Sequence, residues 1–314
     1  MTAGRTGPRA DDLRRLIETR HAALRAELGA VERSPGRDAI HRTRVAARSL
    51  RSLLATLKPL LRPSLLARAR RDLRNMAAEL GDVREADVRR AWLADLARDS
   101  EALSPGACRA LELELERDRD ASRKRLRRHL QSQAYRERSL RLAETLGDRR
   151  FVSAGGNAGD VVALRLRKRW KRLRRAFDAR SADPEALHEL RLAAKHTRYA
   201  SEALMPLLGI EDRRAPKELR ELKRLQDCLG EHRDATEALA WLASLGEPLG
   251  PVLLGRLEDP IGRVRLRRLR ELDGLAKRFK MPRLAPRVAT PGRRRAAGRS
   301  ARSSAPPRRR SPSS

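Results

Sequence analysis

Apolar residues recur along much of the chain at the spacing of a helix. Between residues 10 and 32 they are Leu13, Leu16, Ile17, Leu24 and Leu28. A second stripe, over residues 38–61, includes Val45, Leu53, Leu57 and Leu60. Each set fits one face of a helix with 3.6 residues per turn. Because no segment alternates apolar and polar residues as a half-buried strand does, the pattern predicts an all-α fold.

Helix-breaking residues predict how the first half of the chain is divided. Pro63 and Gly81 are expected to bound a third helix over residues 64–80, and a fourth is expected over residues 83–98.

Later segments carry clearer start signals. Ser104-Pro105 has the form of an N-cap followed by proline at the first helical position, and it predicts a long helix to about residue 130. Another helix is expected to about residue 146. The segment 151–160, FVSAGGNAGD, predicts a linker from its glycine content. Asp183-Pro184 then repeats the helix-start signal.

Two sequence elements occur twice. HRTRVAARSLR (41–51) returns as HELRLAAKHTR (188–198) at an offset of 147 residues, and LGDVREADV (80–88) returns as LGEHRDATE (229–237) at an offset of 149. Further cations on the third helices also correspond: Arg68, Arg71 and Arg74 match Lys217, Arg220 and Lys223. We therefore predict an internal duplication, with one repeat over about 10–147 and the other over about 159–280.

The first repeated element concentrates positive charge on one side of a helix. His41, Arg44, Arg48 and Arg51 fall within a sector of about 80° at 3.6 residues per turn. In the second copy the corresponding residues are His188, Arg191, Lys195 and Arg198. Like charges at this spacing repel. A solvated charged face would explain one such stripe, but two copies beside further cations favour a groove that an anion neutralises.

The composition agrees with a polyanionic partner. The chain of 314 residues has 73 Lys and Arg against 41 Asp and Glu, a net charge of +32. Nucleic acid, an anionic membrane or another polyphosphate could match it. No run of about 18 apolar residues or signal peptide is visible, and Cys108 and Cys228 form no CxxC pair. We expect a cytoplasmic protein without a membrane partner.

Both ends of the chain differ from its middle. Residues 1–9 are expected to be disordered. Residues 281–314 combine Pro, Gly, Ser and Ala with ten arginines and no acidic residue. Such a segment cannot bury a core, so we predict a disordered basic tail. The tail leaves most of the positive charge to the folded part.

Catalytic and metal-binding signatures are absent from the sequence. It contains no GxxxxGK[ST], HExxH or GxSxG motif, so we expect neither an enzyme nor a cofactor. His41 and His188 could donate to a phosphate or could cap and pack, and without a carboxylate set they would make a poor metal site. The carboxylates near the LG elements, Asp82, Glu85, Asp87, Glu231 and Asp234, are expected to pair with Arg84 and Arg233 or to cap the fourth helices. The other histidines, His21, His129, His196 and His232, have no counterpart in the other repeat.

The paired HxxRhAA[RK]xxR and LGxxR[DE] elements resemble those of the CHAD (conserved histidine α-helical domain) family, over roughly residues 10–280. The resemblance implies two four-helix bundles with pseudo-twofold symmetry around a basic cavity that binds inorganic polyphosphate, in some members at polyphosphate granules. It places these residues at the ligand: His41, Arg44, Arg48, Arg51, Arg68, Arg71, Arg74, His188, Arg191, Lys195, Arg198, Lys217, Arg220 and Lys223. For Arg84 and Arg233, a structural salt bridge and ligand contact both stay open.

Two departures from the family pattern concern the turn element, where Glu85 replaces the usual Asp and Thr236 stands opposite Asp87. The ExExK strand of the triphosphate-tunnel enzymes that accompany many members is also absent, which favours a binding module. Two alternatives remain: a nucleoid-type protein that binds DNA through its basic tail, and an enzyme of phosphate esters or a phosphate-accepting histidine protein.

Overall fold

The computed structural model describes residues 8–98, 103–153, 158–209, 215–247 and 249–278. Within these ranges the chain forms nine α-helices and one 3-10 helix, and an isolated bridge joins Leu61 to Val152 without forming a sheet. The fold is all-α, as predicted. In chain order the elements are α1 (Ala10–Arg33), α2 (Arg37–Thr56), η1 (Lys58–Leu60), α3 (Pro63–Arg98), α4 (Pro105–Gln131), α5 (Gln133–Gly147), α6 (Ala158–Asp178), α7 (Pro184–Leu204), α8 (Ala215–Ala243) and α9 (Leu249–Arg278).

The two helix starts predicted from a polar cap followed by proline are confirmed. The backbone N–H of Ala107 donates to Ser104 Oγ over 3.3 Å at the start of α4, and that of Ala186 donates to Asp183 Oδ2 over 2.8 Å at the start of α7. Each cap satisfies one of the four N–H groups that a helix leaves unpaired at its N-terminus. α1 lies within one residue of the predicted 10–32.

The predicted second helix, 38–61, is two elements rather than one. α2 ends at Thr56, and the separate 3-10 turn η1 contains Pro59. Proline lacks the N–H that an α-helix requires and disfavours the α conformation of the residue before it, so the break precedes Pro59 rather than Pro63. Leu57 and Leu60 are buried as expected, whereas Val45 is only partly covered.

The prediction that Gly81 ends a helix is wrong. α3 runs without a break over 36 residues, from Pro63 to Arg98, and joins the predicted third and fourth helices. α8 likewise continues through Gly230. A glycine costs about 1 kcal/mol inside a helix but does not forbid one. The expected caps of fourth helices therefore do not exist at these positions.

The segment 151–160 is not a simple linker. Phe151 and Val152 are buried, and the N–H of Ser153 donates to the carbonyl of Leu60 over 3.0 Å. α6 already begins at Ala158. Residues 154–157, like 1–7 and the predicted basic tail 281–314, lie outside the described residues.

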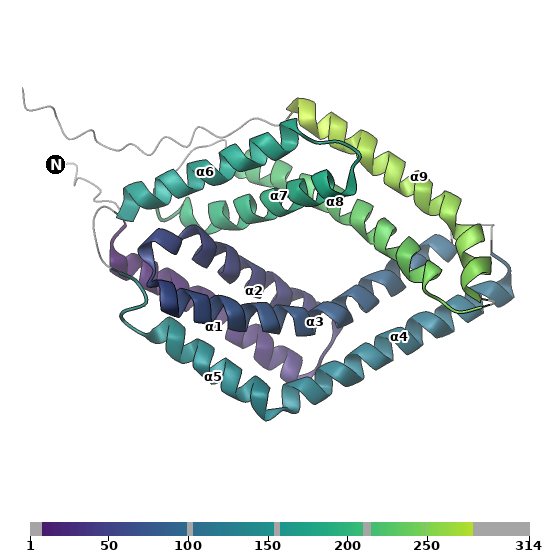
Figure 1. The fold of residues 1–314 in the computed structure, drawn as a ribbon, viewed down its shortest axis with the longest axis horizontal. Helices are drawn as coiled ribbons and strands as arrows, with labels where there is room; N and C mark the ends of the chain where they lie inside the picture. The colour runs from purple at the N-terminus through teal and green to yellow at the C-terminus, as the bar shows by residue number, and fades with distance from the viewer. Residues whose placement is uncertain (1–7, 99–102, 154–157, 210–214, 248, 279–314) are drawn as a thin grey trace, which may run out of the picture.

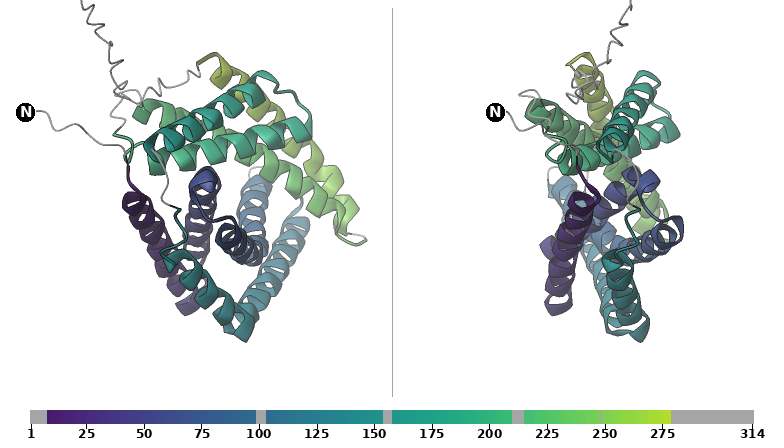
Figure 2. Two further views of the ribbon diagram at one scale, coloured as in Figure 1. Left: turned by 60° about the vertical axis from the view of Figure 1, so that its left-hand side comes forward. Right: turned by 90° about the vertical axis from the view of Figure 1, so that its left-hand side faces the viewer.

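The helices of the first and second halves occupy opposite sides of the molecule (Figures 1 and 2). α1 packs on α2 and α6 on α7, and α2 contacts α7 where the halves meet. The long helices α3 and α8 extend away from this junction and pair with α4 and α9, which contact each other. α4 and α5 are separated only by Ser132. The first half thus has five α-helices, not the four that the resemblance implies.

Buried apolar side chains form two large clusters. The larger joins both halves and includes Leu50 of α2, Trp170 of α6 and Leu190 of α7, none of them exposed. The other fills the far ends of α3, α4, α8 and α9, around Leu93 and Leu257. No described helix is long and apolar enough to cross a membrane.

Candidate anion-binding site

A pocket of about 640 Å³ lies between the two clusters, where α2, α3, α7 and α8 approach one another. Its lining carries seven Arg or Lys side chains and three carboxylates, together with one histidine and a small apolar wall. The charged and polar lining residues are His41, Arg44, Arg48, Arg84, Glu85, Arg89, Arg191, Lys195, Arg233, Asp234 and Glu237. The excess of four positive charges makes the pocket suited to an anion.

Arg44 is a partly buried cation that α2 brings to the pocket. Its Nη1 donates to the carbonyl of Ala77 on α3 over 3.3 Å, and its Nε is buried without a partner. Arg48, one turn further, donates from Nε to the carbonyl of Arg44 over 3.2 Å. Both guanidinium groups keep further N–H donors for a ligand.

Gly81 explains how Arg44 can lie against α3. A Cβ at Gly81 would stand 3.2 Å from Arg44 Nη1, closer than most such contacts. The glycine that the sequence suggested as a helix end is therefore a point of close approach inside a helix, beneath a pocket arginine. Gly230 of α8 has no atom within 4 Å of an added Cβ.

Replacing Gly81 with alanine is expected to separate stability from binding. The free energy of unfolding should rise by about 0.5–1 kcal/mol, because alanine favours a helix. Affinity for a phosphate anion should fall several-fold, because the Arg44 guanidinium is displaced. Gly230→Ala is the matched control: it should stabilise to a similar degree and leave affinity unchanged. Chemical denaturation and a binding titration measure both effects, and equal affinities of the two variants would contradict this role of Gly81.

The second half contributes from α7 and α8. Arg191 has a buried Nε without a partner, and Lys195 follows one turn later. Arg233 forms an ion pair with Glu237 on the same helix. Asp234 is surrounded by Arg191, Arg84 and Arg233, yet burial outweighs these charges and raises the pKa of its carboxyl.

Burial and mutual repulsion weaken the charged forms of the pocket cations. Burial, and then the charge of Arg48, lower the pKa of Arg44 to about 10. Burial, followed by Arg191, Arg48, Arg233 and Arg44, lowers the pKa of Lys195 to about 7. The pKa of His41 is lowered by burial and by Arg84, Arg48 and Arg44. A bound anion would relieve these costs.

Five of the fourteen residues predicted at the ligand line the pocket: His41, Arg44, Arg48, Arg191 and Lys195. The other nine do not: Arg51, Arg68, Arg71, Arg74, His188, Arg198, Lys217, Arg220 and Lys223. Their positions have specific causes. On a continuous α3, Arg68 and Arg71 point about 170° and about 110° away from the centre of the face that carries Gly81 and Arg84. Arg198 instead binds Gln226 and Glu202.

Several lining residues were not predicted. Arg89 lies over the ring of Trp241, with 5.1 Å between its Cζ and the ring centre. Its Nη1 lies 3.5 Å from Oδ2 of Asp118. Val88 also follows Arg84 by one turn of α3. The helical register places these residues on the pocket side only if α3 continues through Gly81. The break that we predicted there therefore left them out of the predicted site.

The carboxylates near the LG elements do not pair as expected. Asp87 binds Arg123 of α4, and Glu231 binds Arg268 of α9. Glu85 and Asp234 line the pocket instead. Within the described residues, no three His, Cys, Asp or Glu side chains gather as a metal site.

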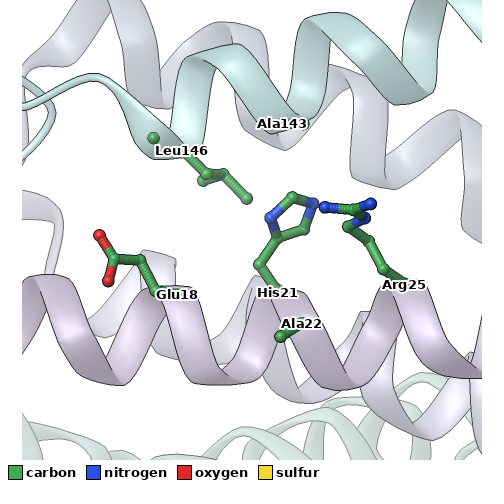
Figure 3. A pocket seen from close by; sticks show the side chains of 7 residues that line it. Glu18, His21, Ala22, Arg25, Ala143 and Leu146 are labelled. Carbon is green, nitrogen blue, oxygen red and sulfur yellow. The ribbon is translucent and has the colours of Figure 1, made fainter.

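The histidines without a repeat counterpart have different surroundings. His129 lies 2.6 Å from Glu79, and His232 is buried beside Arg265, which together with burial lowers its pKa. His21 of α1 lies beside Arg25 and faces α5 across a small pocket of about 190 Å³ (Figure 3). His21 and Arg25 are the only cationic or imidazole side chains among the residues that line it, so it offers an anion far fewer donors than the pocket between the halves.

Solved structures with a similar fold include the following two. The crystal structure of the CHAD domain from the plant Ricinus communis matches with a TM-score of 0.65 and 21% identity, over 88% of this chain and 93% of that chain. PptA from Streptomyces chartreusis matches with a TM-score of 0.65 and 20% identity, over 87% and 98%. At such identities the likeness shows a shared fold.

Sequence comparison gives the family. No curated protein matches the chain. The model of the CHAD domain, however, matches residues 15–243, which is well over half of the chain and contains every residue of the pocket. The chain therefore belongs to the CHAD domain family.

Proposed function

We propose that this protein binds inorganic polyphosphate, without catalysis, in the pocket between its two halves. The observation that carries the proposal is a pocket with seven cations, two of which, Arg44 and Arg191, have a buried Nε without a partner in the described structure. Phosphate oxygens accept from guanidinium groups in bidentate geometry. The CHAD resemblance points to the same ligand, and on that basis we propose a cytoplasmic location at polyphosphate granules.

A flexible phosphate chain fits this site better than duplex DNA does. The lining cations come from four helices and surround a pocket of about 640 Å³. The major groove of a double helix is about 12 Å wide and receives an α-helix or β-ribbon that protrudes from the protein. The duplex as a whole is wider than its groove and does not enter a cavity of that size. A polyphosphate chain carries its charges on a single narrow strand.

We also propose that the two halves arose by duplication. α2 and α7 carry the paired basic elements, α3 and α8 carry the LG elements, and each half supplies cations to the same pocket. The contributions are unequal, since His41 lines the pocket while His188 is exposed elsewhere. The repeat bounds 10–147 and 159–280 remain predictions.

Removing the basic tail distinguishes this function from DNA binding. Residues 281–314 hold ten arginines and no acidic residue, a composition suited to non-specific contact with DNA. A chain truncated after residue 280 is expected to lose most of its affinity for duplex DNA and to keep that for long-chain polyphosphate. Fluorescence titrations at one physiological salt concentration measure both. Loss of polyphosphate binding on truncation would favour a tail-based, nucleoid-type function instead.

A further inference from the structure

A second group of cations lies next to the pocket, where α2, α3, α6 and α7 meet. The charges of Arg74 and Arg70 act on Arg51, and those of Arg165, Arg172 and Arg70 act on Arg169. His196 is influenced by Arg169, Arg51 and Arg172. We call this set the α6 cluster: Arg51, Arg70, Arg74, Arg165, Arg169, Arg172 and His196.

The α6 cluster is almost free of carboxylates. Among the described residues its one ion pair is Arg172 with Glu189, at an exposed edge over 3.1 Å. Arg165 and Arg169 donate from Nε to the carbonyl and hydroxyl oxygens of Thr56 over 3.4 and 3.2 Å. These contacts orient both guanidinium groups but do not neutralise them.

Burial makes this concentration of charge costly. Arg169 is largely covered, and burial followed by the neighbouring arginines lowers its pKa to about 10. His196 has a buried Nδ1 without a partner, and burial and the same charges lower its pKa to about 4. Arg70 and Arg74 are exposed, so the cluster is open to solvent on that side. An anion that entered there would offset the repulsion.

The cluster continues the pocket along two helices. On α3, Arg70, Arg74, Gly81 and Arg84 lie within a sector of about 80°, so the face that leads into the pocket begins in the cluster. On α2, Arg51 follows Arg48 by three residues, an axial rise of about 4.5 Å. The charge of Arg48 acts on Arg51 as well as on Arg44 and Lys195 of the pocket.

We propose that the α6 cluster is a second binding site for phosphoryl groups, which holds one part of a polyphosphate chain while another part occupies the pocket. The protein would then bind long chains more tightly than short ones through contacts that short chains cannot reach. This inference rests on the proposed function of the pocket. It also assigns a role to Arg51 and Arg74, which do not line the pocket.

Two matched double variants test the inference in the full chain. Arg70→Gln/Arg74→Gln removes two exposed cations from the cluster. Arg68→Gln/Arg71→Gln removes two exposed cations whose mean direction on the same helix lies about 110° away. Each is titrated calorimetrically with tripolyphosphate and with long-chain polyphosphate at equal phosphate concentration.

The cluster variant is expected to bind long chains about tenfold more weakly, with a shallower salt dependence, and to bind tripolyphosphate as the parent does. The control variant should bind both ligands like the parent. In the parent, the imidazole resonances of His196 should move with long chains and not with tripolyphosphate.

The outcomes separate the two proposals. If the parent binds both ligands and the two variants bind long chains equally, the α6 cluster is not a site although the pocket is. If the cluster variant loses affinity for tripolyphosphate to the same degree as for long chains, the proposal that long chains occupy the pocket and the cluster together is wrong. If the parent binds neither ligand, the proposed function itself fails.

Discussion

Changing Arg44 and Arg191 together to alanine is expected to weaken polyphosphate binding by about a thousandfold. Each guanidinium has a buried Nε that lacks a partner, and each comes from a different half of the chain. A hydrogen bond to a charged group is worth roughly 1.5–3 kcal/mol, and about 1.4 kcal/mol is a factor of ten in affinity. Calorimetric titration with long-chain polyphosphate at fixed salt measures the loss.

The matched control removes the same number of charges elsewhere. Arg15 of α1 and Arg167 of α6 are exposed and do not line the pocket. Arg15→Ala/Arg167→Ala should weaken binding only by the small effect of net charge. Circular dichroism should show that both variants keep their helices. Equal losses in the two variants would mean that overall charge, rather than the pocket, holds the ligand.

Polyphosphate affinity is expected to fall as the pH rises from 7 to 9, because Lys195 loses its proton. Its pKa of about 7 in the free protein reflects burial first and then the charges of Arg191, Arg48, Arg233 and Arg44. A bound phosphate favours the charged form and raises the pKa, so binding takes up a proton. Affinity should then drop by up to roughly tenfold per pH unit between the free and bound pKa values.

The folding stability of the free protein depends on pH in the opposite direction to the polyphosphate affinity. The unfolded chain holds the Lys195 proton up to about its ordinary pKa of 10.5, whereas the folded chain releases it near 7. Stability contributed by this residue therefore rises with pH across that window, and the penalty is fully present below pH 7.

Titrations in buffers of different ionisation enthalpy measure the proton uptake of the parent. Lys195→Arg is the control: it should bind tightly with little pH dependence, since arginine keeps its charge. His41 does not interfere above pH 7, because its pKa is lowered from 6.5. An equally steep pH dependence in Lys195→Arg would contradict the assignment of the proton to Lys195.

The sequence was sufficient for the fold class and for some of the residues that line the pocket. Apolar periodicity and the caps at Ser104 and Asp183 located helices within a few residues. The two charged stripes contain Arg44, Arg48, Arg191 and Lys195, which line the pocket, together with residues that do not. These features are local, because one turn of helix decides which residues share a face.

Other features depended on contacts between helices. Gly81 was predicted to end a helix because helices commonly end at glycine. Only the close approach of Arg44 in the structure shows what a glycine does at this position inside α3. With a break predicted at Gly81, the positions of Arg84 and Arg89 could not be related to that of Arg74 by the register of one helix. The α6 cluster requires α6 and α7 to lie against α2 and α3, and no spacing within one segment indicates that arrangement.

A competition titration tests the central claim most directly. The full chain is saturated with long-chain polyphosphate and challenged with duplex DNA at equal phosphate concentration and physiological salt, beside the Arg44→Ala/Arg191→Ala variant. If the pocket binds polyphosphate, the parent keeps its ligand and the variant gives it up to DNA. Ready displacement from the parent, with the variant indistinguishable from it, would contradict the account and leave the pocket cations as a charged surface only.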